Sequence, residues 1–99
     1  MVKLVALYRT PTSPEEFDRH FEAVHLPLLR AYPGLRGLEV TRIIGAPLGE
    51  TRYSLMAEAW FETRDSMNAA LSSPEGRAVA RDLLRFAPDV VVFFGITDR

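Results

Sequence analysis

The sequence lacks cysteine, long apolar runs and any marked excess of charge. Without cysteine the chain has no disulfides, no thiolate metal site and no cysteine nucleophile. A formal net charge of -1 over 99 residues gives no basic surface for nucleic acid or for an anionic membrane. No apolar stretch approaches the roughly 18 residues that indicate a membrane span. We therefore expect a soluble, cytoplasmic protein with neither nucleic acid nor a membrane as its partner.

What the chain does contain is typical of a globular protein, with 47% hydrophobic and 25% charged residues. Folding at this length hides roughly 60–65% of the unfolded surface, which is enough for one modest core. We expect a single domain over residues 1–99.

Runs of β-branched and aromatic residues bounded by proline and glycine predict strands. The four expected strands cover residues 2–9, 36–46, 52–62 and 89–97. The turn residues at 47–50 predict a four- or five-residue connection, and hence an antiparallel hairpin, between the second and third strands.

Start signals and apolar periodicity predict the helices. Ser13-Pro14-Glu15-Glu16 predicts a capping box at the start of the first helix, which should end near Tyr32. Its apolar stripe is expected at Phe17, Phe21, Val24 and Leu28. Two further helices are expected, at residues 63–71 and from Ser73-Pro74-Glu75 towards Ala87-Pro88.

The order of these elements predicts an α+β fold of the ferredoxin-like βαββαβ type. Right-handed crossovers then place the helices on one face of a four-stranded antiparallel sheet. The first and last strands are apolar on both faces, so the face without helices should be an exposed apolar patch. We expect a second copy to cover it in an isologous homodimer. Loops that shield this face in a monomer are the alternative.

His25 is the strongest candidate for a functional residue. It lies two residues before Pro27, which should kink the helix, and on the shoulder of the apolar stripe. A histidine there can act as a general base, a ligand or a hydrogen-bond donor near neutral pH. A half-buried structural histidine is the alternative. His20 should point about 140° away from His25 on an α-helix, so we expect no shared metal site.

An apolar pocket between the first helix and the sheet is the expected ligand site, with Tyr8, Phe21 and Trp60 in its walls. These aromatic residues are otherwise simply core. Glu58 is either a pocket carboxylate or an ion-pair partner of Arg42 on the neighbouring strand. The chain has no Gly-rich phosphate loop, nucleophile elbow or spaced carboxylate pair, and we expect no cofactor.

Taken in order and spacing, several segments together resemble the EthD family. They are the opening VKLVALYR, the helix from Phe17 to His25-Leu26-Pro27, Pro33-Gly34-Leu35, Ala59-Trp60-Phe61 and Ser73-Pro74-Glu75. The resemblance implies a dimeric α+β barrel, and it maps the family's His-x-Pro signature onto His25 and Pro27. The family is named for an association with ethyl tert-butyl ether degradation. Relatives in the wider group include haem-degrading monooxygenases, muconolactone isomerases, and polyketide-modifying oxygenases and cyclases.

Three functions remain open at this point, because fold kinship alone does not transfer a reaction. The first is a small enzyme, similar to a monooxygenase, isomerase or cyclase, in which His25 moves a proton or orients a hydrophobic substrate. The second is a non-catalytic binding or accessory module that uses the same pocket. The third is haem binding and degradation with His25 as the axial ligand.

Overall fold

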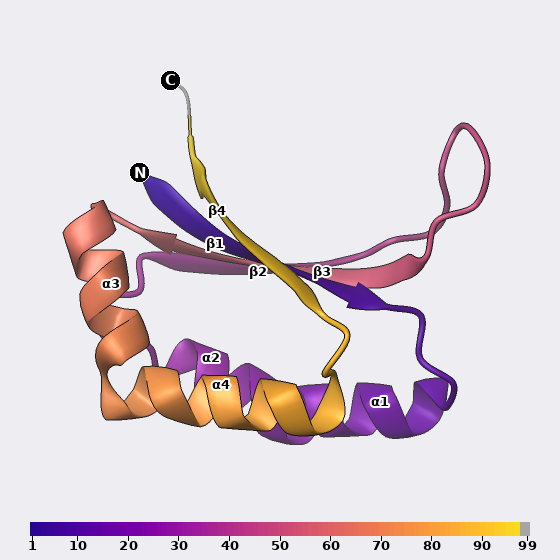
Figure 1. Cartoon of the computed structure of the whole chain (residues 1–99), viewed down its shortest axis with the longest axis horizontal. Coiled ribbons are helices and arrows are strands. Elements are labelled where there is room, and N and C mark those ends of the chain that lie inside the picture. Colours follow the sequence, from indigo (N-terminus) through magenta and orange to yellow (C-terminus); the bar gives the residue numbers. More distant parts are fainter. Residues whose placement is uncertain (98–99) are drawn as a thin grey trace.

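The protein is described by a computed structural model over residues 1–97. Its elements are β1 (Val2–Arg9), α1 (Pro14–His20), the π-helical turn η1 (Phe21–His25), α2 (Leu26–Arg30), β2 (Gly37–Arg42), β3 (Tyr53–Phe61), α3 (Arg64–Ser72), α4 (Pro74–Phe86) and β4 (Val91–Ile96). The strands form an antiparallel sheet in the order β2-β3-β1-β4. Figure 1 shows α1, α2 and α4 beneath one face of this sheet and α3 at one end of it. The predicted ferredoxin-like α+β fold is confirmed.

The two faces of the sheet follow from the strand register. Val2, Leu4, Ala6 and Tyr8 of β1 face the helices, opposite the small and apolar side chains of β3 that complete this side of the core. The other face is called the open face below. It carries Lys3, Val5 and Leu7 of β1, Met56, Glu58 and Trp60 of β3, and Val91 and Phe93 of β4.

The connection between β2 and β3 is longer than the sequence predicts. Pairing continues only as far as Ile43, whose N–H donates to the Ser54 carbonyl at 3.0 Å. A loop over residues 43–52 then projects beyond the sheet (Figure 1), and Ile44 at its start is fully exposed. The expected four- or five-residue connection is therefore wrong, although the two strands are antiparallel as predicted.

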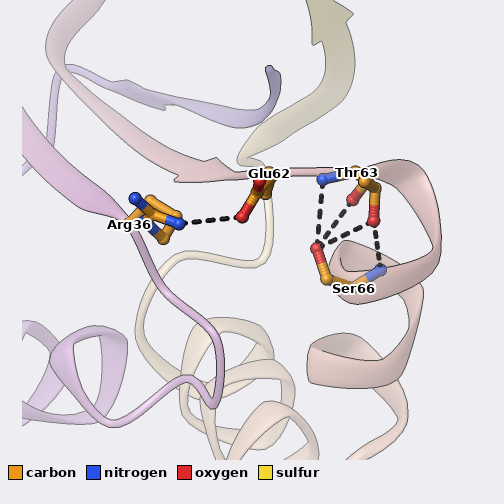
Figure 2. Close-up of polar contacts among 4 residues, drawn as sticks. All are labelled: Arg36, Glu62, Thr63 and Ser66. Carbon is orange, nitrogen blue, oxygen red and sulfur yellow. Dashed lines mark hydrogen bonds and ion pairs between the residues drawn. The ribbon is translucent and has the colours of Figure 1, made fainter.

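Side-chain caps start two of the helices. The Ser66 N–H donates to Thr63 Oγ1 at 3.1 Å, and the Thr63 N–H donates to Ser66 Oγ at 3.2 Å (Figure 2). This capping box begins α3, and in the same view the Arg36–Glu62 ion pair joins the segments flanking β2 and β3. At α4 the Ser73 hydroxyl accepts from the Gly76 N–H at 3.0 Å.

The capping box predicted at Ser13 is wrong. The Ser13 side chain makes no hydrogen bond to the first turn of α1, where only its carbonyl accepts, from the Phe17 N–H at 3.0 Å. The Ser13 backbone lies at φ -123° and ψ 83°, outside the extended conformation found at Thr63 and Ser73.

The first helix is interrupted by the wide turn η1, and this shifts its buried side. The Leu26 N–H donates to the Phe21 carbonyl, five residues back, immediately before the proline that lacks an N–H. A π-turn takes up one more residue than an α-turn, so later side chains trail the α-helical pattern. Val24, predicted in the buried stripe, is 42% exposed, and its place is taken by His25.

Candidate functional site

A carboxylate from α4 joins the two histidines of the first helix. Asp82 Oδ2 lies 2.9 Å from His25 Nδ1, and Asp82 Oδ1 lies 2.9 Å from His20 Nε2. An ionised carboxylate only accepts hydrogen bonds, so each ring nitrogen that faces it carries a hydrogen and donates. The prediction that His20 and His25 point apart is wrong. They stand one π-turn apart and share a single partner.

His25 lies at the centre of the buried side of its helix rather than on the shoulder. Its exposed fraction is 0%, and its ring is surrounded by those of Tyr8, Phe21 and Phe86, with centroids 4.7–6.2 Å away. Since Nδ1 carries the hydrogen, Nε2 has a lone pair directed into this aromatic surrounding. Among residues 1–97, Nε2 is buried without a hydrogen-bond partner. Such an orphaned acceptor is uncommon in a folded interior.

Burial keeps the interior imidazole neutral. Desolvation lowers the pKa of His25 below its ordinary value, the Asp82 carboxylate opposes this shift, and the nearby His20 adds to it. Burial likewise raises the pKa of the Tyr8 phenol, so that Tyr8 remains protonated and cannot act as a base. The neutral His25 imidazole, with its tautomer fixed by a carboxylate, is the arrangement that orients a general base in hydrolase triads.

A groove opens at the start of the first helix, with Phe86 in its wall. It has a volume of about 420 Å³, and its walls comprise Pro11, Thr12, Ser13, Glu16, Phe17, His20 and Phe86. A neighbouring depression shares Pro11, Thr12, Phe17 and Phe86 with it. The Phe86 centroid lies 4.7 Å from the rings of both His20 and His25, so Phe86 stands against both histidines. His20 lines this groove, whereas His25 lines none of the pockets described.

Metal ligation finds no support in the side-chain geometry. Over the described part of the chain, no group of three or more histidine and carboxylate side chains is placed to hold a metal ion. In the cluster of His20, His25 and Asp82, the ring nitrogens His20 Nε2 and His25 Nδ1 are engaged in hydrogen bonds to the Asp82 carboxylate.

Comparison with known proteins identifies the family. The EthD domain model matches residues 9–94. The chain belongs to the EthD family. An ethyl tert-butyl ether D (EthD) family protein from Bacillus halodurans C-125 is 39% identical, with a TM-score of 0.95 and 99% of each chain covered.

Two further relatives are more distant. An uncharacterized 11.0 kDa protein from the thcB-thcC intergenic region of Rhodococcus erythropolis is 26% identical over 87 residues, which cover 88% of this chain and 84% of that protein. A dimeric ferredoxin-like protein of unknown function from Thermobifida fusca YX is 20% identical and has a TM-score of 0.73, covering 97% of this chain and 90% of the other. At that identity the likeness shows the fold alone.

In this EthD chain only part of the predicted site comes together. Tyr8 and Phe21 pack around His25, with ring centroids 6.2 and 5.8 Å from the imidazole, but neither lines any of the pockets described. Trp60 and Glu58 lie on the open face, on the opposite side of the sheet from Tyr8. Their placement in a pocket with His25 is therefore wrong, because alternate side chains of β3 point to opposite faces.

The predicted ion pair of Glu58 exists with a different partner. Glu58 Oε2 lies 2.8 Å from Lys3 Nζ, on the neighbouring strand β1. Arg42 instead faces the helix side and pairs with Asp18 of α1, at 3.1 Å. The register of the sheet decides this, since Glu58 and Arg42 are on opposite faces.

Asp82 is the functional candidate that the sequence analysis of this EthD chain missed. It lies in the buried stripe of α4, between Val79 and Phe86, and is only 8% exposed. A carboxylate within an apolar stripe needs a partner, because an unpaired buried charge is costly. That position was the available signal, and it indicated a cationic or hydrogen-donating residue on the facing helix.

Proposed function

We propose that the protein binds a hydrophobic ring compound beside its first helix and exchanges a proton with it, with His25 as the acceptor. The observation that supports this most is the pairing of a fixed Nδ1–H with a buried, partnerless Nε2. A neutral imidazole held this way accepts a proton at Nε2 while Asp82 stabilises the cation that forms. The aromatic rings around Nε2 favour a flat, apolar ligand.

A binding or accessory module without turnover is the second candidate, and the closure of the site favours it. His25 is fully buried, so a ligand reaches Nε2 only if a neighbouring ring moves. Phe86, which is half-buried and is the last residue of α4, is the ring placed to do so. A binding module would use His25 and Phe86 in the same way as an enzyme, to hold the ligand and to open the site.

His25→Asn tests whether His25 is the acceptor, and the search for a product separates the two candidates. The asparagine amide can donate to Asp82 as Nδ1–H does, but it has no counterpart of Nε2. With 1-naphthol as the probe, the proposal predicts that the wild-type Nε2 nitrogen-15 resonance moves on binding and that His25→Asn weakens the affinity about tenfold, the effect of about 1.4 kcal/mol. The ether 1-methoxynaphthalene, which has no hydroxyl hydrogen, should bind both proteins equally.

Equal naphthol affinity in the two proteins, with an unmoved Nε2 resonance, would rule out His25 as the acceptor. Retained naphthol binding and a moved resonance, with no product from any hydroxylated ring compound, would favour the accessory module. A urea unfolding curve for His25→Asn establishes that the variant is folded.

Haem does not fit the site as its side chains stand. An axial histidine must present a nitrogen to an opening wide enough for a porphyrin. The His25 ring is enclosed on several sides by aromatic side chains that belong to the core. The orphaned Nε2 alone would suit iron, but its surroundings do not admit the macrocycle.

We also infer a homodimer formed through the open face and β4. Exposed apolar side chains gather on this edge strand, where Phe93 is 46% and Phe94 58% exposed. The helices leave both sides of β4 uncovered, and the Thermobifida fusca neighbour is a dimer. Wild-type protein should sediment as a dimer and Phe93→Glu as a monomer. Leu84→Glu, at a 68% exposed position on α4, should leave the dimer intact. A monomeric wild type at high concentration would contradict this inference.

Within residues 1–97 none of the helices is long and apolar enough for a bilayer crossing. The cytoplasmic location and the single domain expected from the sequence stand as proposals alongside the function.

A further inference from the structure

His20 offers a second acceptor nitrogen, on a side chain that is partly exposed. Its Nε2 donates to Asp82, so Nδ1 carries the lone pair of the neutral ring. Among the residues described, no hydrogen bond engages His20 Nδ1. The side chain is 35% exposed and forms part of the groove wall between Phe17 and Phe86.

The buried carboxylate gives His20 a fixed orientation that a surface histidine lacks. Asp82 is 8% exposed and is already anchored by His25, so it holds the His20 ring from inside the protein. Both Asp82 oxygens lie 2.9–3.0 Å from His20 Nε2, so the hydrogen of the neutral ring stays on Nε2 and Nδ1 keeps its lone pair. The groove therefore contains a positioned acceptor next to two aromatic walls.

We propose that this groove binds a flat ring compound bearing a hydroxyl hydrogen, a phenol or an enol, and that His20 Nδ1 accepts the hydrogen bond from that hydroxyl. The volume of about 420 Å³ lies in the range of small-molecule sites. Phe17 and Phe86, with ring centroids 5.4 Å apart, provide the apolar contact.

Charge selects a neutral ligand over an anionic one. Glu16 lines the groove, and Asp82 lies behind His20, so a carboxylate-bearing ring would meet like charge. A neutral hydroxyl meets a nitrogen lone pair instead. This inference rests on the proposed function for the class of ligand, but it depends on His20 and not on His25.

The test measures affinity for 1-naphthol and 1-methoxynaphthalene in wild type, His20→Gln and His25→Asn. The glutamine amide nitrogen can keep the donation to Asp82 that Nε2 makes, while the ring nitrogen Nδ1 is lost. We expect naphthol to bind His20→Gln about tenfold more weakly, as for the loss of one hydrogen bond of about 1.4 kcal/mol. The methyl ether should bind the wild type, His20→Gln and His25→Asn equally. Backbone amide shifts in the wild type should move at residues 12–20 when naphthol binds.

The two variants test the two histidines separately. Weaker naphthol binding in both variants, with the ether unaffected, supports the groove and the proposed function together. Weaker naphthol binding in His20→Gln alone supports the groove and overturns His25 as an acceptor. The reverse pattern overturns the groove and leaves the proposed function standing. Amide shifts confined to β4, or equal weakening of naphthol and its ether in His20→Gln, also overturn the inference. Urea unfolding of both variants confirms that they are folded under the conditions of the titration.

Discussion

Replacement of Asp82 perturbs the hydrogen bonds of both His20 and His25, because the two rings share its carboxylate. The carboxylate accepts one N–H from each of two imidazoles, and hydrogen bonds to a charged group contribute about 1.5–3 kcal/mol each. Asp82→Asn keeps one acceptor oxygen but turns an NH2 group towards the other imidazole, so one bond is lost or one ring changes tautomer. We expect a loss of about 1.5–3 kcal/mol in the free energy of unfolding.

Asp82→Ala removes both acceptors and leaves the His25 N–H buried without a partner. The expected loss is about 3–5 kcal/mol, for two hydrogen bonds to a charged group at about 1.5–3 kcal/mol each. It falls short of the sum of two full bonds because His20 is partly exposed and recovers a bond to water. A loss of this size would be a large part of the 5–15 kcal/mol typical of small domains.

Urea unfolding at neutral pH measures both losses. The matched control is Asp89→Asn, at an exposed carboxylate beyond the end of α4, for which a change within about 0.5 kcal/mol is expected. If Asp82→Asn is as stable as this control, the cluster does not hold the helices together and the argument for a fixed His25 tautomer fails.

Three further predictions follow from the packing and the buried imidazole. Gly76→Ala should destabilise α4 although alanine is the better helix former, since its Cβ would overlap the Ala70 carbonyl oxygen. Gly45→Ala, which meets nothing within 4 Å, is the control in thermal unfolding. Burial lowers the pKa of His25, so below about pH 6.5 the unfolded chain takes up a proton that the folded chain excludes. The free energy of unfolding should therefore decrease as the pH is lowered below 6.5, by up to about 1.4 kcal/mol per pH unit. His25→Asn should flatten that slope, and a pH-independent wild type would contradict it. Haemin titration should give no Soret shift, and a shift that His25→Asn abolishes would show that the aromatic cage opens for a porphyrin.

Local signals were enough for most of the fold. The strand at residues 2–9 and the caps at Thr63 and Ser73 were predictable because each depends on neighbouring residues alone. The hairpin connection was not, because the point at which pairing stops depends on the register with β3.

The site was predictable only in part, and one local event explains most of the difference. The wide turn before Pro27 adds a residue to one turn, which moves His25 from the shoulder to the core and brings His20 onto the same side. A helical wheel of constant pitch contains no such step. Asp82 comes from a helix 57 residues further along, so its meeting with His25 depends on tertiary packing.

Burial keeps His25 neutral, and Asp82 fixes its tautomer so that Nε2 is free to accept a proton. Imidazole nitrogen-15 shifts of labelled protein at neutral pH test this claim most directly. The structure predicts a protonated Nδ1 and an unprotonated Nε2 for His25, with the Nε2 resonance moving when 1-naphthol is added. A hydrogen on Nε2, or a doubly protonated His25 ring, would contradict the account.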